Sequence, residues 1–374
     1  MFRYEFFHEL KYWLTRRSVY LYAVTFISLG SLIFLGSLGL FDPIPEEKSE
    51  ESWLNSPSGI NYIILYFHKL MLVLLPAIVG GSLYKDYKYQ AHSIIYSFPL
   101  HKKSYLLGRL LAGGLIVVGI SILTVIAFAI SEQMNGLNPN LLGPFVPEAY
   151  LHTFFWYLLP NWIIFGMLTF SVVMHSRSNL AAYLVLIIPF LIQLIVENAF
   201  VGSDYFVALF DPFGQNVAGF YQKNWEVEAK NIRPLPVSSL LIFNRFLWLG
   251  VSFTVFFYVY NKFRFVEIIE RKTTGKKGGS TAGINDQIAL EREIEEIQTE
   301  FSLKHLLLVL ITTAVINIRQ VLKSKVFWVV IGLSLASAVF IMLKATALED
   351  FIMVPATQIL TGSPLTIYSI VIML

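Results

Sequence analysis

Six stretches of the sequence are each about 20 residues long and consist almost entirely of apolar side chains. A helix needs about 20 such residues to cross the hydrocarbon core of a bilayer, because lipid offers no hydrogen-bond partner to an open backbone. We therefore predict an all-α, polytopic helical membrane protein. Its predicted spans are 18–40, 60–83, 105–130, 151–174, 179–199 and 238–260.

The composition and the short motifs exclude several classes of function. Hydrophobic residues make up 56% of the chain and charged residues 14%, and there is no Cys, so disulfides and thiolate sites are excluded. The net charge of +3 is too small to indicate nucleic-acid binding. The sequence has neither an HExxH zinc motif nor a phosphate loop of the GxxxxGKS or GxxxxGKT type. We predict that the chain binds no metal or cofactor and is not itself an enzyme.

Basic residues concentrate in alternate connections between the predicted spans. Residues 1–17, 84–104 and 262–301 contain most of the Lys and Arg that lie outside the spans. In contrast, the segment 42–59 has five acidic residues and one Lys, and 132–150 has no Lys or Arg. Because basic loops stay on the cytoplasmic side, we expect the N-terminus in the cytoplasm and the 200–237 loop outside.

The first 17 residues predict an interfacial amphipathic helix. Their large apolar side chains recur at spacings of three and four, which favours a helix lying along the inner membrane face. This helix is either an ordinary basic anchor or an elbow helix that braces the first span, and the sequence does not separate the two. The apolar positions are Phe2, Phe6, Phe7, Leu10, Trp13 and Leu14.

The connection 84–104 reads YKDYKYQAHSIIYSFPLHKKS, which is too polar to span and too apolar for a simple linker. Ile94, Ile95 and Phe98 would be unfavourable if they faced water, so we expect a partner surface for them. Pro99 should end a short helix just before the basic residues Lys102 and Lys103. The alternative is a loop folded back on its own spans.

The other connections contain turn and linker signals. The outer loop 200–237 is rich in aromatic residues and contains a turn-forming tetrad, Asp211, Pro212, Phe213 and Gly214, so we expect short re-entrant helices there. Residues 262–301 combine a Gly-rich linker with an exposed helix of alternating charge.

An internal repeat predicts that a second half begins near residue 302. The Ser56-Pro57 pair that precedes the second span recurs as Ser363-Pro364, ahead of an apolar run that stops after ten residues. We therefore expect 302–374 to contain an interfacial helix, a seventh span at 326–345 and a truncated eighth span. On this interpretation the chain is a fragment of a longer protein. The stretch 303–318 could insert as a span, but the repeat assigns it to the interfacial helix.

Ionisable residues within spans are costly, so His68 and Lys69 in the second span need an explanation. One hypothesis has them face a translocation path or pair with Glu197. The other, which we favour, has Lys69 extend to the interface while His68 bonds to a neighbouring helix. The Asn244-Arg245 pair in the sixth span could neutralise an acid and is interpreted as structural.

Two stretches resemble the ABC-2-type permease domains of bacterial proteins in which such a domain precedes a zinc aminopeptidase-like domain. They are YKDYKYQAHSIIYSFPLHKKSYLLGRLLAGG at 84–114, and DPFG at 211–214 followed by LLIFNRFLWLG at 240–250. The resemblance extends over essentially the whole chain, including the six-span order and the repeat, although each motif is short. It implies a permease of two six-span halves in the bacterial cytoplasmic membrane, engaged in export.

The same resemblance implies the partners and the coupling residues. Cytoplasmic ABC ATPase subunits would bind ATP and Mg, and a second permease half would come from the same full-length chain or from a second copy. Membrane lipids are the remaining expected partner. The segment similar to the family's ATPase-coupling helix contains Tyr84, Asp86, Tyr87, Ile94, Ile95, Tyr96, Phe98, Pro99, Lys102 and Lys103.

Two other functions compete with an ATP-driven permease. A secondary transporter usually needs acidic residues or broken helices near the middle of the membrane, and these spans offer few. A membrane anchor for a C-terminal peptidase-like domain is compatible with the fusion that the resemblance suggests. An HExxH motif downstream of Leu374 would support the anchor, and an adjacent gene for a P-loop ATPase would support the permease.

Overall fold

The computed structural model describes residues 2–38, 40, 53–98, 100–134, 137, 142–200, 202–265, 312 and 315. The chain divides into two units, Met1–Glu267 and Ile268–Leu374, and every element described below belongs to the first. The described residues form helices and no strands. Six helical segments are long and apolar enough to cross a membrane by their length and composition. The predicted multi-pass helical membrane protein is therefore confirmed in its coarse form.

The six segments coincide with the six predicted spans. They are Arg17–Ser37, Pro57–Lys88, Lys102–Ser131, Pro147–Ser176, Asn179–Ala199 and Ser239–Lys262. The predicted seventh and eighth spans, and the linker and charged helix beyond residue 265, lie outside the described residues. Of the predicted second interfacial helix, only positions 312 and 315 are described.

The N-terminal part of this unit contains the first three spans and the connection between the second and third. The helices that build it are α1 (Phe2–Leu14), α2 (Arg17–Ser37), α3 (Pro57–Met71), the π-helix η1 (Leu75–Gly80), α4 (Gly81–Lys88), α5 (His92–Ile95) and α6 (Lys102–Ser131).

The C-terminal part of the same unit contains the fourth, fifth and sixth spans and the helices of the 200–237 loop. They are α7 (Pro147–Thr153), the π-helix η2 (Phe154–Leu158), α8 (Leu159–Ser176), α9 (Asn179–Val185), α10 (Ile187–Ala199), α11 (Asp204–Phe210), α12 (Gln215–Gln222), α13 (Val227–Ile232) and α14 (Ser239–Lys262).

Proline and its neighbours set several of these boundaries. Ser56 caps α3 by accepting a hydrogen bond from the Gly59 N–H, and Pro57 follows at the first helical position, where its missing N–H is not needed. Within the second span, Pro76 cannot donate to the preceding turn, and the backbone there adopts the π-helix η1. A second π-helix, η2, precedes Pro160 in the fourth span. Both of these spans therefore carry an irregular turn.

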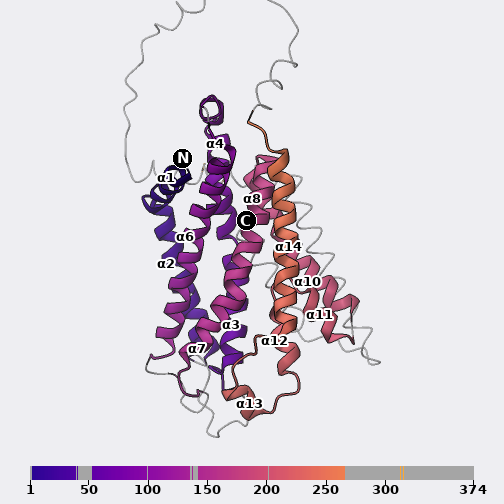
Figure 1. Ribbon diagram of the computed structural model, residues 1–374. Coiled ribbons are helices and arrows are strands. Elements are labelled where there is room, and N and C mark those ends of the chain that lie inside the picture. The colour runs from indigo at the N-terminus through magenta and orange to yellow at the C-terminus, as the bar shows by residue number, and fades with distance from the viewer. Residues whose placement is uncertain are drawn as a thin grey trace, which may run out of the picture. The chain divides into compact units, whose positions relative to one another are not determined.

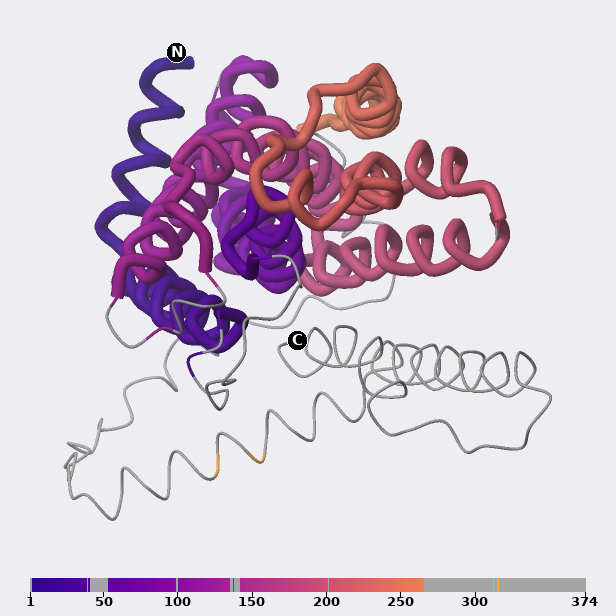
Figure 2. The backbone as a smooth tube through the Cα atoms, turned by 90° about the horizontal axis from the view of Figure 1, so that it is seen from below, coloured from indigo at the N-terminus to yellow at the C-terminus, as the bar shows by residue number. Residues whose placement is uncertain are grey.

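The second and fourth spans form the centre of the unit. In each, 72% of the most apolar stretch is buried, against 28% for the first and fifth spans. Figure 2 shows the second span at the centre, with α2 on one side and the α9–α12 region on the other. The central spans are thus surrounded by protein, while the outer spans keep apolar faces that suit contact with lipid.

The two ends of the bundle carry different elements. Figure 1 shows α1 and α4 at one end and α7, α12 and α13 at the other. The loop residues of the second end are tied together by Asn55, whose Nδ2 donates to Glu132 Oε1 at 2.7 Å and to the Gly143 carbonyl at 2.9 Å. We call the end with α1 and α4 the α1 end.

The helix α1 packs along α6. This corrects the prediction that its apolar side chains all face the membrane. Trp13 is buried and Phe6 is half-buried, whereas Phe2, Phe7 and Leu14 are exposed. The apolar residues therefore do not form one membrane face, because some of them cover α6. The acidic Glu9 is only 1% exposed because it forms a buried ion pair described below.

Gly108 permits the close approach of α1 to α6. A Cβ at this position would lie 3.0 Å from Glu5 Cβ and 3.2 Å from the Phe6 nitrogen. We expect Gly108→Leu to push α1 away and to cost about 1–3 kcal/mol, the usual range for overpacking. Thermal unfolding and amide exchange of residues 2–14 would measure this. Gly119→Leu is the matched control, since a Cβ there meets nothing within 4 Å, and equal effects would contradict the expectation.

Candidate functional site

The connection between the second and third spans is built from α4, α5 and the start of α6 at the α1 end. The second span continues without a break from η1 into α4, and the chain then turns at Gln90, which has a φ of 53°. The single-turn helix α5 follows, and α6 begins at Lys102. The sequence predicted a short helix in this connection, but not the turn at Gln90, and Pro99, which was expected to end the helix, lies outside the described residues.

A buried ion pair holds the base of this connection. Arg109 of α6 lies 2.7 Å from the Asp86 carboxylate of α4, and both side chains are at least nine-tenths buried. The Tyr105 hydroxyl donates to the same carboxylate oxygen at 2.6 Å. Arg109 Nη1 also donates to the backbone carbonyl of Ser82, in the second span, at 2.7 Å. These four residues cross-link the second and third spans.

A second ion pair attaches α1 to the same place. Lys85 Nζ lies 2.7 Å and 2.6 Å from the two carboxylate oxygens of Glu9. The Lys85 ammonium also lies over the Tyr12 ring, 3.7 Å from its centre. Burial raises the pKa of the Tyr12 hydroxyl, so the ring faces the cation as a neutral phenol. We refer to Glu9, Ser82, Lys85, Asp86, Tyr105 and Arg109 together as the α4–α6 network.

Tyrosine side chains connect α5 to this network. The Tyr96 hydroxyl donates to the Tyr87 hydroxyl at 2.9 Å, and the His92 ring nitrogen lies 3.3 Å from the Asp86 carbonyl oxygen. Burial raises the pKa of Tyr96, which keeps its proton on the oxygen. The centre of the Tyr96 ring also lies 4.8 Å from the centre of the Phe265 ring, and Phe265 follows the end of α14. The short helix is therefore anchored on one side to several spans.

The other side of the connection presents apolar side chains to the exterior. Tyr89, Ile94 and Phe98 are 65%, 67% and 62% exposed, and none of the α5 residues is buried. We call these three residues the apolar tip. Exposed large apolar side chains that gather at one place mark contact sites more often than isolated ones do.

The structure divides eight of the ten residues of the predicted coupling segment into three groups. Asp86, Tyr87 and Tyr96 belong to the anchored side, and Ile94 and Phe98 form most of the exposed tip. The third group is half-buried. It comprises Tyr84, Ile95 and Lys102.

Two predicted coupling residues remain. Lys103 is exposed at the start of α6. Pro99 lies outside the described residues. Sequence reasoning missed Glu9 and Arg109 as parts of this site, because their partners are far away in the sequence or on another helix.

A second polar cluster lies in the spans, around Lys69. Its ammonium donates to Gln193 Oε1 at 3.0 Å and to Gln215 Oε1 at 2.7 Å, and the side chain is buried. The proposed pairing with Glu197 is wrong, because Glu197 Oε1 instead accepts hydrogen bonds from Gln193 and Asn216. Gln193 belongs to α10 and Gln215 to α12 of the outer loop, so the ammonium reaches the outer loop, and its extension to the membrane interface stays a prediction.

His68 lies beside this cluster but makes no hydrogen bond. It is 1% exposed, and neither ring nitrogen has a partner among the described residues, so the expected bond to a neighbouring helix is absent. Its ring packs edge-on against Trp162, with 4.5 Å between the ring centres. Of the two candidate path residues, the structure connects Lys69 to the outer loop and leaves His68 in an aromatic contact.

The outer-loop tetrad forms the predicted turn and is buried. Asp211 Oδ1 accepts the Phe213 N–H at 2.9 Å, and Oδ2 accepts the Asn216 N–H at 2.7 Å. Burial raises the pKa of Asp211, although those N–H groups and the nearby Lys69 oppose this shift. Pro212 lies between Asp211 and Phe213 in the chain, and Gly214 has a φ of 76°. The turn ends α11 and begins α12, as the tetrad predicted.

Side chains of the fourth and sixth spans hold this turn in place. Asn244 Nδ2 donates to three backbone carbonyls at the end of α11 and the start of the turn, at distances of 2.8–2.9 Å. Arg245 Nη1 donates to Asn161 Oδ1 at 2.7 Å, and Asn161 Nδ2 donates to the Phe213 carbonyl at 3.1 Å. Arg245 thus binds an amide, and among the described residues no ion pair joins it to an acid.

No group of three or more His, Cys, Asp or Glu side chains that could hold a metal ion occurs among the described residues. The two polar clusters instead join helices to one another. Comparison of the sequence with protein-family models and with curated proteins finds no match. The case for a function therefore depends on the geometry of these two clusters and on the sequence patterns.

Proposed function

We propose that this chain is the permease component of an ATP-driven transporter of the ABC-2 type, located in a bacterial cytoplasmic membrane. The apolar tip would dock on a cytoplasmic ATPase subunit, which binds and hydrolyses ATP with Mg. The single observation that carries the proposal is a short helix with an exposed apolar side and an opposite side that Tyr96 and His92 attach to α4, where buried ion pairs join the spans. The resemblance of 84–114 to coupling segments supports the same assignment.

The α4–α6 network is suited to transmit a force from the tip to the spans. A displacement of α5 acts on Tyr96 and Tyr87, and through Asp86 and Arg109 on the second and third spans. Buried ion pairs resist separation, because parting them leaves an uncompensated charge in a medium of low dielectric constant. The tip and the cytoplasmic ends of these spans would therefore move as one body.

The irregular turns in the central spans supply places where such a body can pivot. The π-helix η1 follows α3 and lies directly before α4, and it packs against α8 and α6. Short π-helical segments mark points at which a helix departs from regular hydrogen bonding, frequently at functional sites. We infer that movement of the tip changes the angle of the second span at η1.

The orientation and the missing half are parts of the same proposal. The Lys and Arg of residues 1–17 and 84–104 favour the cytoplasm for the α1 end, which places the tip where an ATPase can reach it. The second permease half would come from residues 302 onward or from a second copy. The cluster around Lys69 and Asp211 would then brace the helices α11 and α12, which we call the outer hairpin, on the opposite side.

Capture of an ATPase tests the proposal. The tagged full chain is co-expressed with a candidate cytoplasmic P-loop ATPase and purified in a mild detergent. Ile94→Asp combined with Phe98→Asp is expected to reduce ATPase capture by about 30-fold, the effect of losing about 2 kcal/mol of hot-spot contact. Retained ATPase is measured per permease by quantitative mass spectrometry.

The matched control adds the same two charges beside the tip. Ser93 and Ser97 are exposed on the same segment, and each hydroxyl bonds only to the backbone nearby. Ser93→Asp with Ser97→Asp should leave capture within about threefold, since rim charges contribute little. Equal capture by both variants and the native chain would show that the tip does not dock on the ATPase. The membrane-anchor alternative would then gain support.

A further inference from the structure

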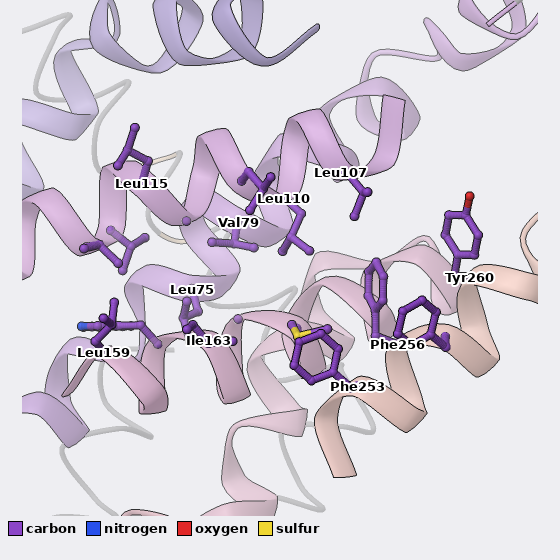
Figure 3. A pocket seen from close by; sticks show the side chains of 18 of the residues that line it. Leu75, Val79, Leu107, Leu110, Leu115, Leu159, Ile163, Phe253, Phe256 and Tyr260 are labelled. Carbon is purple, nitrogen blue, oxygen red and sulfur yellow. The ribbon is translucent and has the colours of Figure 1, made fainter. Parts of the chain in front are cut away.

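An apolar groove of about 870 Å³ runs between α6 and α14 and has η1 and α8 as its floor. Figure 3 shows Leu107 and Leu110 of α6 across the groove from Phe253 and Phe256 of α14, with Ile163 of α8 to one side, next to Leu75. Its volume lies within the range of about 300–1,000 Å³ that is typical of ligand sites. All four lining elements belong to membrane-spanning segments.

The groove contains open space that no described side chain fills. A Cβ added at Gly114, which lines the groove on α6, would meet nothing within 4 Å. Large apolar side chains along its walls also remain exposed, among them Leu111 at 50% and Phe257 at 53%. In a membrane-spanning segment such a hollow is filled by lipid chains or by another helix, because water there is unfavourable.

Cations gather at the end of the groove that belongs to the α1 end. Lys103 lines the groove, and the Lys102 ammonium lies 4.5 Å from the centre of the Tyr260 ring, which also lines it. Arg264 follows two residues after α14 ends at Lys262, and Tyr260 belongs to the last turn of the same helix. Within the part of the chain that the structure describes, no ion pair joins these three basic side chains to an acid. The geometry is that of an apolar channel with a cationic rim.

We propose that this groove binds an anionic glycerophospholipid from the leaflet at the α1 end, with its phosphate at Lys102 and Lys103. Basic pockets between membrane helices bind anionic headgroups on the cytoplasmic side of membranes. The stripe from Lys103 to Val118 along α6 covers about 22 Å of helix, at 1.5 Å per residue. The chains of one leaflet cover half of a hydrocarbon core of about 30 Å, so an acyl chain fits within the groove.

The rim and the lining make different predictions for lipid binding. The full chain is exposed to phosphatidylglycerol or to phosphatidylcholine with identical acyl chains, and bound lipid is counted by native mass spectrometry. The native chain should bind phosphatidylglycerol more strongly. Lys102→Gln with Lys103→Gln should reduce phosphatidylglycerol binding by about fivefold for each lysine lost, and leave phosphatidylcholine binding unchanged.

A blocked groove provides the second arm of the test. Gly114→Phe places a ring in the open space and should abolish the bound lipid of both kinds, because the acyl chain has nowhere to lie. Gly119→Phe is the matched control on the same helix, since a Cβ there also meets nothing and the residue does not line the groove. It should bind lipid as the native chain does.

Three results would overturn the proposal. Equal binding of the two lipids to the native chain would remove the role of the cationic rim. Equal lipid binding by the Gly114→Phe and Gly119→Phe chains would remove the role of the groove. A photo-cross-linking side chain in place of Leu111 should capture phospholipid, and capture of residues 302–374 of the chain instead would assign the groove to packing of a further helix.

Discussion

Replacing Arg109 with methionine is expected to lower the free energy of unfolding by about 3–5 kcal/mol, the cost of leaving a buried carboxylate without its cation. Asp86 and Arg109 are 4% and 7% exposed, so water cannot replace the lost partner. The Tyr105 hydroxyl would remain as a donor to Asp86, but the Ser82 carbonyl would lose the hydrogen bond that Arg109 donates to it. This is the largest loss that we expect from one substitution near the tip.

Removing both charges should cost less than the single changes suggest. In a chain with Asp86→Leu and Arg109→Met, no charge is left buried at this place, and apolar replacements of buried pairs are often tolerated. We therefore expect the double variant to be more stable than the sum of its two single effects implies, with a coupling of about 0.5–3 kcal/mol. Thermal unfolding in one detergent, monitored by tryptophan fluorescence, measures the stability of the native chain, the two single variants and the double variant.

An exposed ion pair provides the control for this prediction. The Lys223 and Asp204 side chains form an ion pair but are 64% and 49% exposed. Lys223→Met should change stability by no more than about 0.5 kcal/mol, since exposed pairs contribute little. If Arg109→Met and Lys223→Met shift the unfolding midpoint equally, the α4–α6 network does not hold the second and third spans together.

Gly214→Ala is expected to destabilise the outer hairpin by about 2–5 kcal/mol, combining about 1–2 for a left-handed backbone and about 1–3 for overpacking. The added Cβ would lie 1.9 Å from Arg245 Nη2 and 2.7 Å from Arg245 Cζ. Arg245 would have to move and would lose its hydrogen bond to Asn161. Because Asn161 also holds the Phe213 carbonyl, the turn would loosen from the fourth and sixth spans.

Two other glycines separate the strain from the clash. Gly202 has a φ of 90°, and a Cβ there meets nothing within 4 Å, so Gly202→Ala should cost only the left-handed strain of about 1–2 kcal/mol. Gly219 lies in α12 with open space around it, and Gly219→Ala should be neutral or slightly stabilising. Unfolding midpoints and amide exchange over 204–222 measure the three variants. Similar losses for Gly202→Ala and Gly214→Ala would show that Arg245 does not confine the turn.

The spans could be predicted because each one is decided locally. A run such as 105–130 contains enough apolar residues to cross a bilayer, and its backbone bonds lie within the segment itself. The turn at Asp211 to Gly214 was predictable for a similar reason, since Asp accepts the N–H groups that follow it in the chain. Local signals of this kind do not depend on which helices become neighbours.

The polar partners could not be predicted in the same way. Glu9 and Lys85 are 76 positions apart, and Lys69 and Gln215 are 146 positions apart. Nothing in the spacing of such residues indicates that they meet. The sequence suggested Glu197 as one possible partner of Lys69, but two neutral amides accept the hydrogen bonds of the ammonium.

The sequence by itself determined that this is a helical membrane protein with six candidate spans, a short helix after the second and a tight turn before the sixth. Those features follow from apolar run length and from residues that act on their own backbone. Only the tertiary structure decided which side of the 84–104 connection is anchored and which is exposed, and that α6 and α14 leave a groove. Anchoring, exposure and open space depend on which helices pack together, a property of the folded chain that no single segment carries.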